Sequence, residues 1–268
     1  MLIAVGPRPF HRPSSPAARA LAVLSGSQPD APSNPRNARA DPLVSVIVPT
    51  LNEARTLPGL LDHLAALPGR FDIVVADGAS PDGSAQVARA HPAGPRVVEA
   101  PAGRALQLNA GAAASSGEIL VFVHADSRLP SGAHRSLAAA CRDARVVGGN
   151  FALRFEGDDR FARGLASYYR VSRRLGAYYG DSSIFVRREV FERLGGFAEL
   201  PIMDDYDFAR RLERAGPTAC LPGPATTSSR RWRRRGVPRT VASWAAIQIL
   251  YCVGVPAARL APLYRRVR

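Results

Sequence analysis

The stretch GRALQLNAGAAASSGEILVFVHADS, residues 103–127, joins a helix to a strand in the order that decides the fold. Its alanine- and leucine-rich first half favours a helix over 104–115. The apolar residues 118–123 favour a buried strand. His124 and Asp126 follow two positions apart, so they point to the same side of an extended chain. Such a pair is either a metal or phosphate site or a solvated strand end.

Strands and helices alternate on both sides of this stretch. We expect strands at 43–50, 71–77 and 96–100, a helix at 53–67 with leucines at helical spacing, and a longer edge strand at 146–155. Units of this kind form parallel sheets with helices on both faces. The sequence therefore predicts an α/β fold, with a mostly parallel mixed sheet in a single catalytic domain.

Composition and charge limit the classes of partner. The net charge is +14, and all 36 basic residues among the 268 are arginines. This excess favours anionic partners: nucleotide phosphates, nucleic acid or an acidic membrane surface. Cys141, Cys220 and Cys252 form no CxxC pair, which argues against a disulfide framework or structural zinc and for a reducing compartment. No stretch reaches the ~20 consecutive apolar residues that cross a bilayer.

The two ends of the chain differ in composition from its middle. Residues 1–42 are rich in Pro, Ser, Ala and Arg, and we expect a disordered tail or a wrongly chosen start codon. An arginine-rich leader of this kind also fits an organellar transit peptide. Residues 236–268 contain an apolar helix, 241–255, bracketed by arginines.

Carboxylates follow three of the expected strands. Glu53 comes after the first, Asp77 after the second and Asp126 after the fourth. Ligands of open parallel sheets gather at the carboxyl ends of the strands, so we expect these side chains to share one rim. Any one of them alone could be a cap, as Asp82 before a helix could. The sequence has no GxxxxGK[ST] loop, which excludes a P-loop NTPase, and no GxGxxG after the first strand.

Several ordered motifs carry a resemblance to a known family. VSVIVPTLNE, VADGASPDGS, the stretch 103–127, GGF…MDDYDFARRLERAG and RRW occur in this order between residues 43 and 235. Together they resemble the family 2 glycosyltransferases with the Rossmann-like GT-A fold. The resemblance is to the short bacterial branch with His-Ala-Asp in place of Asp-x-Asp. It implies a nucleotide-sugar half at 43–127 and an acceptor half at 128–235.

The resemblance implies roles for residues of the first half. Pro49, Asn52 and Glu53 would line the nucleotide pocket, and Asp77 would accept hydrogen bonds from the base or ribose. Arg104 would clamp the diphosphate, unless it is only a solvated helix start.

The His-Ala-Asp motif implies a metal-diphosphate position. Asp126 would hold a divalent cation, Mg²⁺ or Mn²⁺, on the two phosphates of the donor. His124 would steady the ribose. If it coordinated instead, its nitrogen would favour Mn²⁺.

The MDDYD motif implies the catalytic base. Asp205 would remove the acceptor hydroxyl's proton, with Asp204 as the second choice. Repulsion among Asp204, Asp205 and Asp207 would raise at least one pKa toward a useful range. Acidic residues are also favoured at any helix N-terminus, so the turn has a purely structural interpretation as well.

The segment SSRRW matches the family's Gln-x-x-Arg-Trp in part. Arg231 and Trp232 fit, and Ser228 replaces glutamine. The resemblance implies that this pair lies near the acceptor and diphosphate, with Asp181 of GDSS beside the acceptor hydroxyl. A partial motif favours transfer of a single sugar over processive synthesis.

The function that follows is inverting transfer of one sugar from a nucleotide-diphosphate sugar to a hydroxyl or carboxyl acceptor. The acceptor would be lipid-like, such as a carotenoid acid or a polyprenyl-type molecule. The alternatives are a sugar-nucleotide or nucleotidyl transferase on the same fold, and a basic nucleic-acid-binding protein. Six arginines lie between residues 230 and 239, but no helix-turn-helix, RNP or zinc-finger pattern accompanies them, so we expect no nucleic acid partner.

The C-terminal arginines and the apolar helix after them suggest a location. A basic segment followed by such a helix can rest on an anionic bilayer without spanning it. We therefore expect a cytoplasmic protein, peripheral on the inner face of the cell membrane. The alternative is a C-terminal helix that packs on the core.

Overall fold

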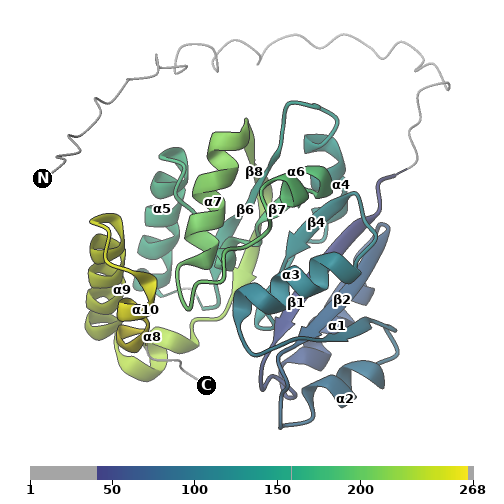
Figure 1. The fold of residues 1–268 in the computed structure, drawn as a ribbon, viewed down its shortest axis with the longest axis horizontal. Helices are drawn as coiled ribbons and strands as arrows, with labels where there is room; N and C mark the ends of the chain where they lie inside the picture. The colour runs from purple at the N-terminus through teal and green to yellow at the C-terminus, as the bar shows by residue number, and fades with distance from the viewer. Residues whose placement is uncertain (1–40, 158, 265–268) are drawn as a thin grey trace, which may run out of the picture. The chain divides into compact units, whose positions relative to one another are not determined.

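A mixed eight-stranded sheet is the centre of the fold (Figure 1), with the strand order β3-β2-β1-β4-β7-β6-β8-β5. The computed structural model describes residues 41–157 and 159–264, without the side chains of residues 231 and 235. The expected tail, 1–42, therefore lies almost wholly outside the described residues. The strands are β1 Val44–Thr50, β2 Phe71–Asp77, β3 Arg96–Glu99, β4 Ile119–Phe122, β5 Ser127–Arg128, β6 Gly148–Phe155, β7 Phe185–Arg187 and β8 Thr218–Thr227.

Helices cover both faces of this sheet. They are α1 Leu57–Ala65, α2 Ser84–Arg89, α3 Arg104–Ala114, α4 Ala133–Ala140, α5 Arg160–Arg174, α6 Arg188–Arg193, α7 Asp204–Ala215, α8 Arg230–Arg235, α9 Val237–Cys252 and α10 Ala257–Leu260, with short 3-10 turns η2 Gly180–Ser182 and η3 Ala261–Leu263. Helices α1 and α4 share one apolar cluster with the sheet, and α3, α6 and α7 share the other. Alternation in the strands produces this division: Val121 of β4 faces the first cluster, and Leu120 and Phe122 face the second.

The first half of the sheet is parallel, as predicted. β1 pairs with β2 and β4, and β2 pairs with β3. Thr50 lies opposite Asp77 at the end of the β1–β2 pair, so the loops after these strands start at one edge. Helix α1 begins at Leu57, later than expected, with Pro58 in its first turn, where proline is favoured.

The second half of the sheet reverses direction. β7 runs antiparallel to β4 and β6, and β6 pairs in parallel with β8. The prediction that 146–155 forms an edge strand is wrong, because β6 lies between β7 and β8. β8 was not expected at all, since Pro222 and Pro224 interrupt its apolar pattern.

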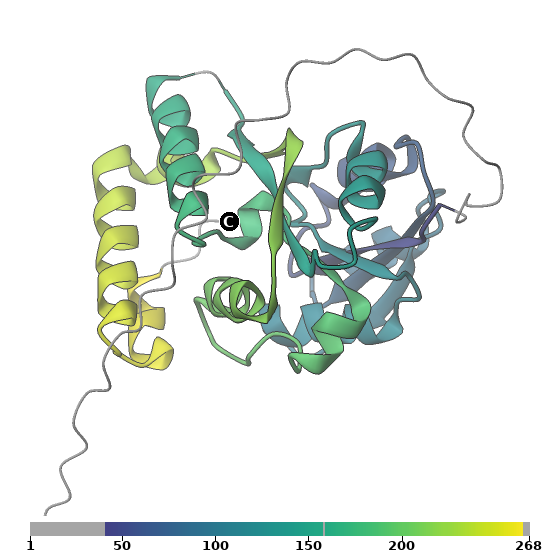
Figure 2. The same ribbon diagram turned by 90° about the horizontal axis from the view of Figure 1, so that it is seen from above.

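The C-terminal helices have apolar clusters of their own. One contains Trp232 of α8 and reaches α5 and α9, and another contains Ile247 of α9 and Leu260 of α10. Figure 2 shows α5 and α9 on the same side of the sheet, away from α1. Within the described residues, no helix has both the length and the apolar content to cross a bilayer.

Candidate active site

Four residues in the described part of the chain share an unusual backbone conformation. Asn52, Ala79, Ser183 and Met203 are the non-glycine residues with positive φ there, at 57°, 57°, 51° and 65°. Each such residue costs about 1–3 kcal/mol and persists only where its surroundings impose it, most often at functional sites. All four flank residues that the sequence assigns to the site. The backbone therefore marks this region independently of the motifs.

Polar contacts join the loops after β1 and β2. The N–H of Ser80 donates to Asp77 Oδ2 over 2.8 Å, and the N–H of Asn52 donates to Ser80 Oγ over 3.0 Å. Asp77 is 2% exposed, and its Oδ1, like Asn52 Oδ1, is buried without a hydrogen-bond partner. Buried polar atoms normally have partners. Two such acceptors, on residues that Ser80 links, suit a ligand that brings N–H or O–H groups.

A glutamine from α3 holds the ends of these two strands together. Gln107 Nε2 donates to the carbonyl of Thr50 over 2.6 Å and to that of Ala76 over 3.0 Å. The N–H of Glu53 donates to Ser84 Oγ, at the start of α2, over 2.9 Å. Pro49 is a half-buried residue of β1, one position before the end of the strand.

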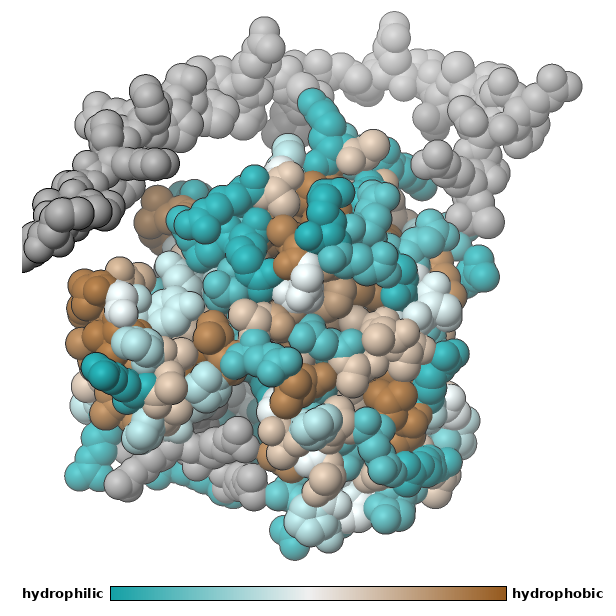
Figure 3. Space-filling model, viewed as in Figure 1, coloured by the Kyte–Doolittle hydropathy of each residue, from teal (hydrophilic) through white to brown (hydrophobic). Residues whose placement is uncertain are grey.

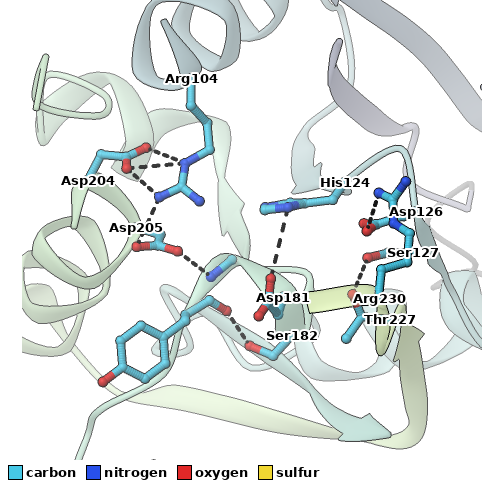
Figure 4. Close-up of polar contacts among 12 residues, drawn as sticks. Arg104, His124, Asp126, Ser127, Asp181, Ser182, Asp204, Asp205, Thr227 and Arg230 are labelled. Carbon is cyan, nitrogen blue, oxygen red and sulfur yellow. Dashed lines mark hydrogen bonds and ion pairs between the residues drawn. The ribbon is translucent and has the colours of Figure 1, made fainter. Parts of the chain in front are cut away.

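Arg104 binds the two adjacent carboxylates at the start of α7 (Figure 4). Its Nε donates to Asp204 Oδ2 over 2.9 Å, its Nη2 also contacts Asp204, and Nη2 lies 3.2 Å from Asp205 Oδ1. The Asp204 side chain is 1% exposed and therefore depends on this partner. In this structure Arg104 thus holds the acidic turn rather than standing open for a diphosphate.

Asp205 also binds the backbone of the opposite turn. The N–H of Gly180 donates to its Oδ2 over 2.9 Å, and the N–H of Tyr206 donates to its Oδ1 over 2.8 Å. Burial alone would raise the pKa of Asp205, but the Arg104 guanidinium and the Gly180 N–H hold that pKa below its ordinary value. The prediction that crowding raises a pKa is therefore wrong at Asp205. Attraction by the Arg104 guanidinium and the hydrogen bond from Gly180 together outweigh the effect of burial on this pKa.

The two residues of the His-Ala-Asp motif face different partners. His124 Nδ1 lies 4.0 Å from Asp181 Oδ1, and Figure 4 shows the ring directed toward the η2 turn. A Cβ added to Gly180 would lie 2.8 Å from His124 Nε2 and 3.2 Å from Asp205 Oδ2. Only glycine therefore lets His124 and Asp205 approach the same turn.

Asp126 points away from this group, toward α8 (Figure 4). Arg230 Nη2 donates to Asp126 Oδ2 over 2.8 Å and lies 3.9 Å from Glu53 Oε1. Across 41–157 and 159–264, no group of three or more His, Cys, Asp or Glu side chains is placed to hold a metal ion. Asp126 is a partly exposed carboxylate at this place, and a cation bound there would need ligands from outside the described residues.

The RRW segment lies on α8 with its tryptophan in the core. Trp232 is 5% exposed, and its ring packs against Phe155 and Phe161 at centroid distances of 5.0 and 5.3 Å. The side chain of Arg231 lies outside the described part of the chain. Trp232 is therefore an anchor for α8 in this structure, and Arg230 of the same helix reaches the rim.

The family model for "Glycosyl transferase family 2" matches residues 45–195, which is more than half of the chain. The chain belongs to glycosyl transferase family 2. This membership favours the glycosyltransferase interpretation over the nucleotidyl transferase and the nucleic-acid-binding protein.

Relatives with similar sequences extend the comparison. The PGL/p-HBAD biosynthesis glycosyltransferases of Mycobacterium bovis and Mycobacterium tuberculosis are 35% identical over 96 residues. The match covers 34% of this chain and spans only 38% of the length of those relatives.

Solved structures confirm the predicted GT-A fold. The mannosyltransferase PcManGT of Pyrobaculum calidifontis, solved with GDP-Man and Mn²⁺, is 25% identical, with a TM-score of 0.60 over 84% of this chain and 68% of that one. Glucosyl-3-phosphoglycerate synthase of Mycobacterium tuberculosis, solved with Mn²⁺, UDP-Glc and phosphoglyceric acid, is 23% identical, with a TM-score of 0.56 over 80% of this chain and 81% of that one. At that identity the second likeness concerns the fold alone.

Three residues that contact the site were not assigned from the sequence. Arg230 is one of a run of arginines, and nothing in the run distinguishes it from Arg231. Gln107 lies mid-helix, where its two carbonyl partners come from distant strands. Gly180 lies directly before Asp181, and its closeness to Asp205 follows only from the tertiary fold.

Proposed function

We propose that this protein transfers a sugar from a nucleotide-diphosphate sugar to a hydroxyl or carboxyl acceptor, with inversion at the anomeric carbon. The observation that carries the proposal is the shared rim. The unpartnered acceptors of Asn52 and Asp77 lie on one side, and the ionised Asp205 lies on the other, held by Arg104. Backbone strain concentrates at the same loops.

The nucleotide occupies the pocket of the β1 and β2 loops. Asp77 Oδ1 and Asn52 Oδ1 accept hydrogen bonds from the base or ribose, which leaves neither atom buried without a partner. Pro49 and Glu53 line the pocket. Arg230 lies beside Asp126, where its guanidinium neutralises charge on the diphosphate.

The residues at this rim fit a divalent cation that is held mainly by the donor. Asp126 offers a hard carboxylate oxygen, which suits Mg²⁺ or Mn²⁺, and the diphosphate of the donor offers further oxygens. When bound, such a cation stabilises negative charge on the departing diphosphate. His124 faces the η2 turn, so its role here is to position donor or acceptor groups near Asp181.

Asp205 acts as the general base. Its pKa lies below the ordinary value, so the carboxylate is ionised at neutral pH and accepts the proton of the attacking acceptor group. Arg104 and the N–H of Gly180 fix the orientation of the two carboxyl oxygens. Asp204 binds Arg104 and is thereby a positioning residue.

The acceptor side of the rim is rich in tyrosine, which supports a lipid-like or otherwise apolar acceptor. Tyr179 stacks on Tyr206 at a centroid distance of 5.6 Å, and Tyr206 meets Tyr251 of α9 at 6.1 Å. These rings continue from Asp205 toward the C-terminal helices. An acceptor that carries an apolar chain beside its hydroxyl group would fit along them.

Two variants test the proposal. Nucleotide-sugar binding and transfer are measured with UDP- and GDP-sugars in the presence of Mn²⁺ or Mg²⁺. Asp205→Asn is expected to bind the donor normally and to transfer about 10²–10⁴-fold more slowly. Asp126→Ala is expected to lose the metal-dependent part of nucleotide binding. Transfer at the parent rate by both variants would overturn the assignment.

A further inference from the structure

The exposed apolar side chains of the described residues are confined to two regions. All seven exposed large ones lie on α5 and its C-cap or between the start of α9 and η3: Tyr168, Val171, Leu175, Val241, Ile249, Val253 and Leu263. The rest of the described surface exposes none. Isolated exposed apolar residues are normal, but such confinement indicates an interaction surface.

Helix α9 is apolar on its outer side as well as on its inner side. Ile247 is 3% exposed and packs in the C-terminal cluster, whereas Val241, Ile249 and Val253 recur at multiples of four residues and are 41, 62 and 72% exposed. Figure 3 shows apolar side chains gathered over α9 at the left of the view. A helix that is apolar all round is normally covered by something.

Helix α5 extends this surface. Leu165 and Tyr169 of α5 share an apolar cluster with Trp232 of α8 and Trp244 of α9. Figures 1 and 2 both place α5 next to α9. Val171 and Leu175, separated by one helical turn, are 56 and 75% exposed.

The chain segments that contain these elements are rich in arginine and lack acids, although α9 itself has one arginine, Arg239. Residues 214–268 contain eleven arginines and no aspartate or glutamate, and residues 160–180 contain five arginines and no acid. Asp159, at the N-cap of α5, lies 4.0 Å from Arg233. Two of these arginines are already paired with acids from outside the segments: Arg173 with Glu213 over 3.1 Å and Arg230 with Asp126 over 2.8 Å.

We infer that the face formed by α5 and α9 docks on an anionic lipid bilayer. The apolar residues enter the boundary between headgroups and acyl chains, and the arginines contact the anionic headgroups. With 16 residues, α9 is shorter than the ~20 residues that cross a bilayer, so it would lie along the membrane surface. A second copy of the chain fits this face poorly, because a twofold contact would set arginines against arginines without compensating acids. Docking does not depend on the proposed sugar transfer, although it would bring a lipid-like acceptor to the tyrosines beside Asp205.

The test is flotation of the full chain with vesicles, without donor or acceptor. The parent is expected to float with vesicles of phosphatidylcholine and phosphatidylglycerol, less so at high salt, and not with phosphatidylcholine alone. The double variant Ile249→Asp/Val253→Asp is expected to bind at least about tenfold more weakly, because it removes apolar area and adds negative charge. Leu175→Asp is expected to weaken binding independently from α5.

A matched control carries the same two charges elsewhere. Ala65→Asp/Ala139→Asp places them at exposed positions of α1 and α4 and is expected to bind like the parent. Circular dichroism and thermal unfolding verify that all variants fold. Failure of the parent to float overturns the inference, and so does equal weakening by the control pair. A parent dimer that Ile249→Asp/Val253→Asp dissociates would show instead that the face binds a second copy.

Discussion

Arg104 controls the protonation of Asp205, the proposed base. Its Nη2 lies 3.2 Å from Asp205 Oδ1, and this positive charge favours the ionised carboxylate. Replacement by a neutral amide in Arg104→Gln therefore raises the pKa of Asp205. We expect the acid limb of kcat/KM for sugar transfer to move to higher pH in the variant. Parallel pH profiles of parent and variant measure the shift, and superimposable acid limbs would contradict it.

The same substitution acts on stability. Asp204 is buried, and without Arg104 it loses its partner, which costs about 3 kcal/mol of unfolding free energy at neutral pH. Because the folded-state pKa of Asp205 is lowered, its own stabilising contribution is complete above the ordinary value of 3.8 and is lost as the pH falls through the folded-state pKa. Urea denaturation checks both effects. Arg135→Gln, at an exposed position of α4, is the control and is expected to change little.

At the scale of elements, one glycine sets how closely α3 approaches the sheet. A Cβ at Gly111 would lie 2.5 Å from Ile47 Cγ2 in β1, whereas a Cβ at Gly164 in α5 would meet no atom within 4 Å. Gly111→Ala is therefore expected to lower the free energy of unfolding by about 1–3 kcal/mol through overpacking. Gly164→Ala is expected to raise it by about 1 kcal/mol through helix propensity. Equilibrium urea unfolding distinguishes them, and a stabilised Gly111→Ala would show that α3 can move outward.

Elements with a local signal were predictable from the sequence, and those that depend on distant pairing were not. β1, β2 and α3 match their expected ranges to within one residue, because their apolar spacing is set by their own residues. β8 carries prolines and owes its place to pairing with β6, about 70 residues earlier. The site divides in the same way. The carboxylates at the ends of the strands could be predicted, but the contact of Arg230 with one of them could not.

At the scale of the whole molecule, side-chain contacts join the C-terminal segment to the turn after β4 and to the start of β5. Arg230 binds Asp126 across 104 positions of sequence, and Ser127 Oγ donates to Thr227 Oγ1 over 3.1 Å beside it. In this arrangement Asp126 binds the Arg230 guanidinium directly, and Glu53 lies 3.9 Å from it. A donor diphosphate that draws the guanidinium toward itself would release the carboxylate for a cation. On the proposed function, donor binding and the placement of α8 would thereby be linked.

This link predicts a selective loss in Arg230→Gln. In the proposed site the guanidinium would contact phosphate, whereas its approach to the nucleotide pocket is limited to Glu53 at 3.9 Å, so affinity for a nucleoside diphosphate is expected to fall about tenfold or more. Affinity for the corresponding nucleoside is expected to stay within about twofold, because Asp77 and Asn52 are untouched. Calorimetric titration of both ligands measures the ratio, with Arg233→Gln on the same helix as the control. Equal weakening of both ligands would mean that Arg230 acts by holding α8 in place, because a phosphate contact cannot reduce the affinity of a ligand that has no phosphate.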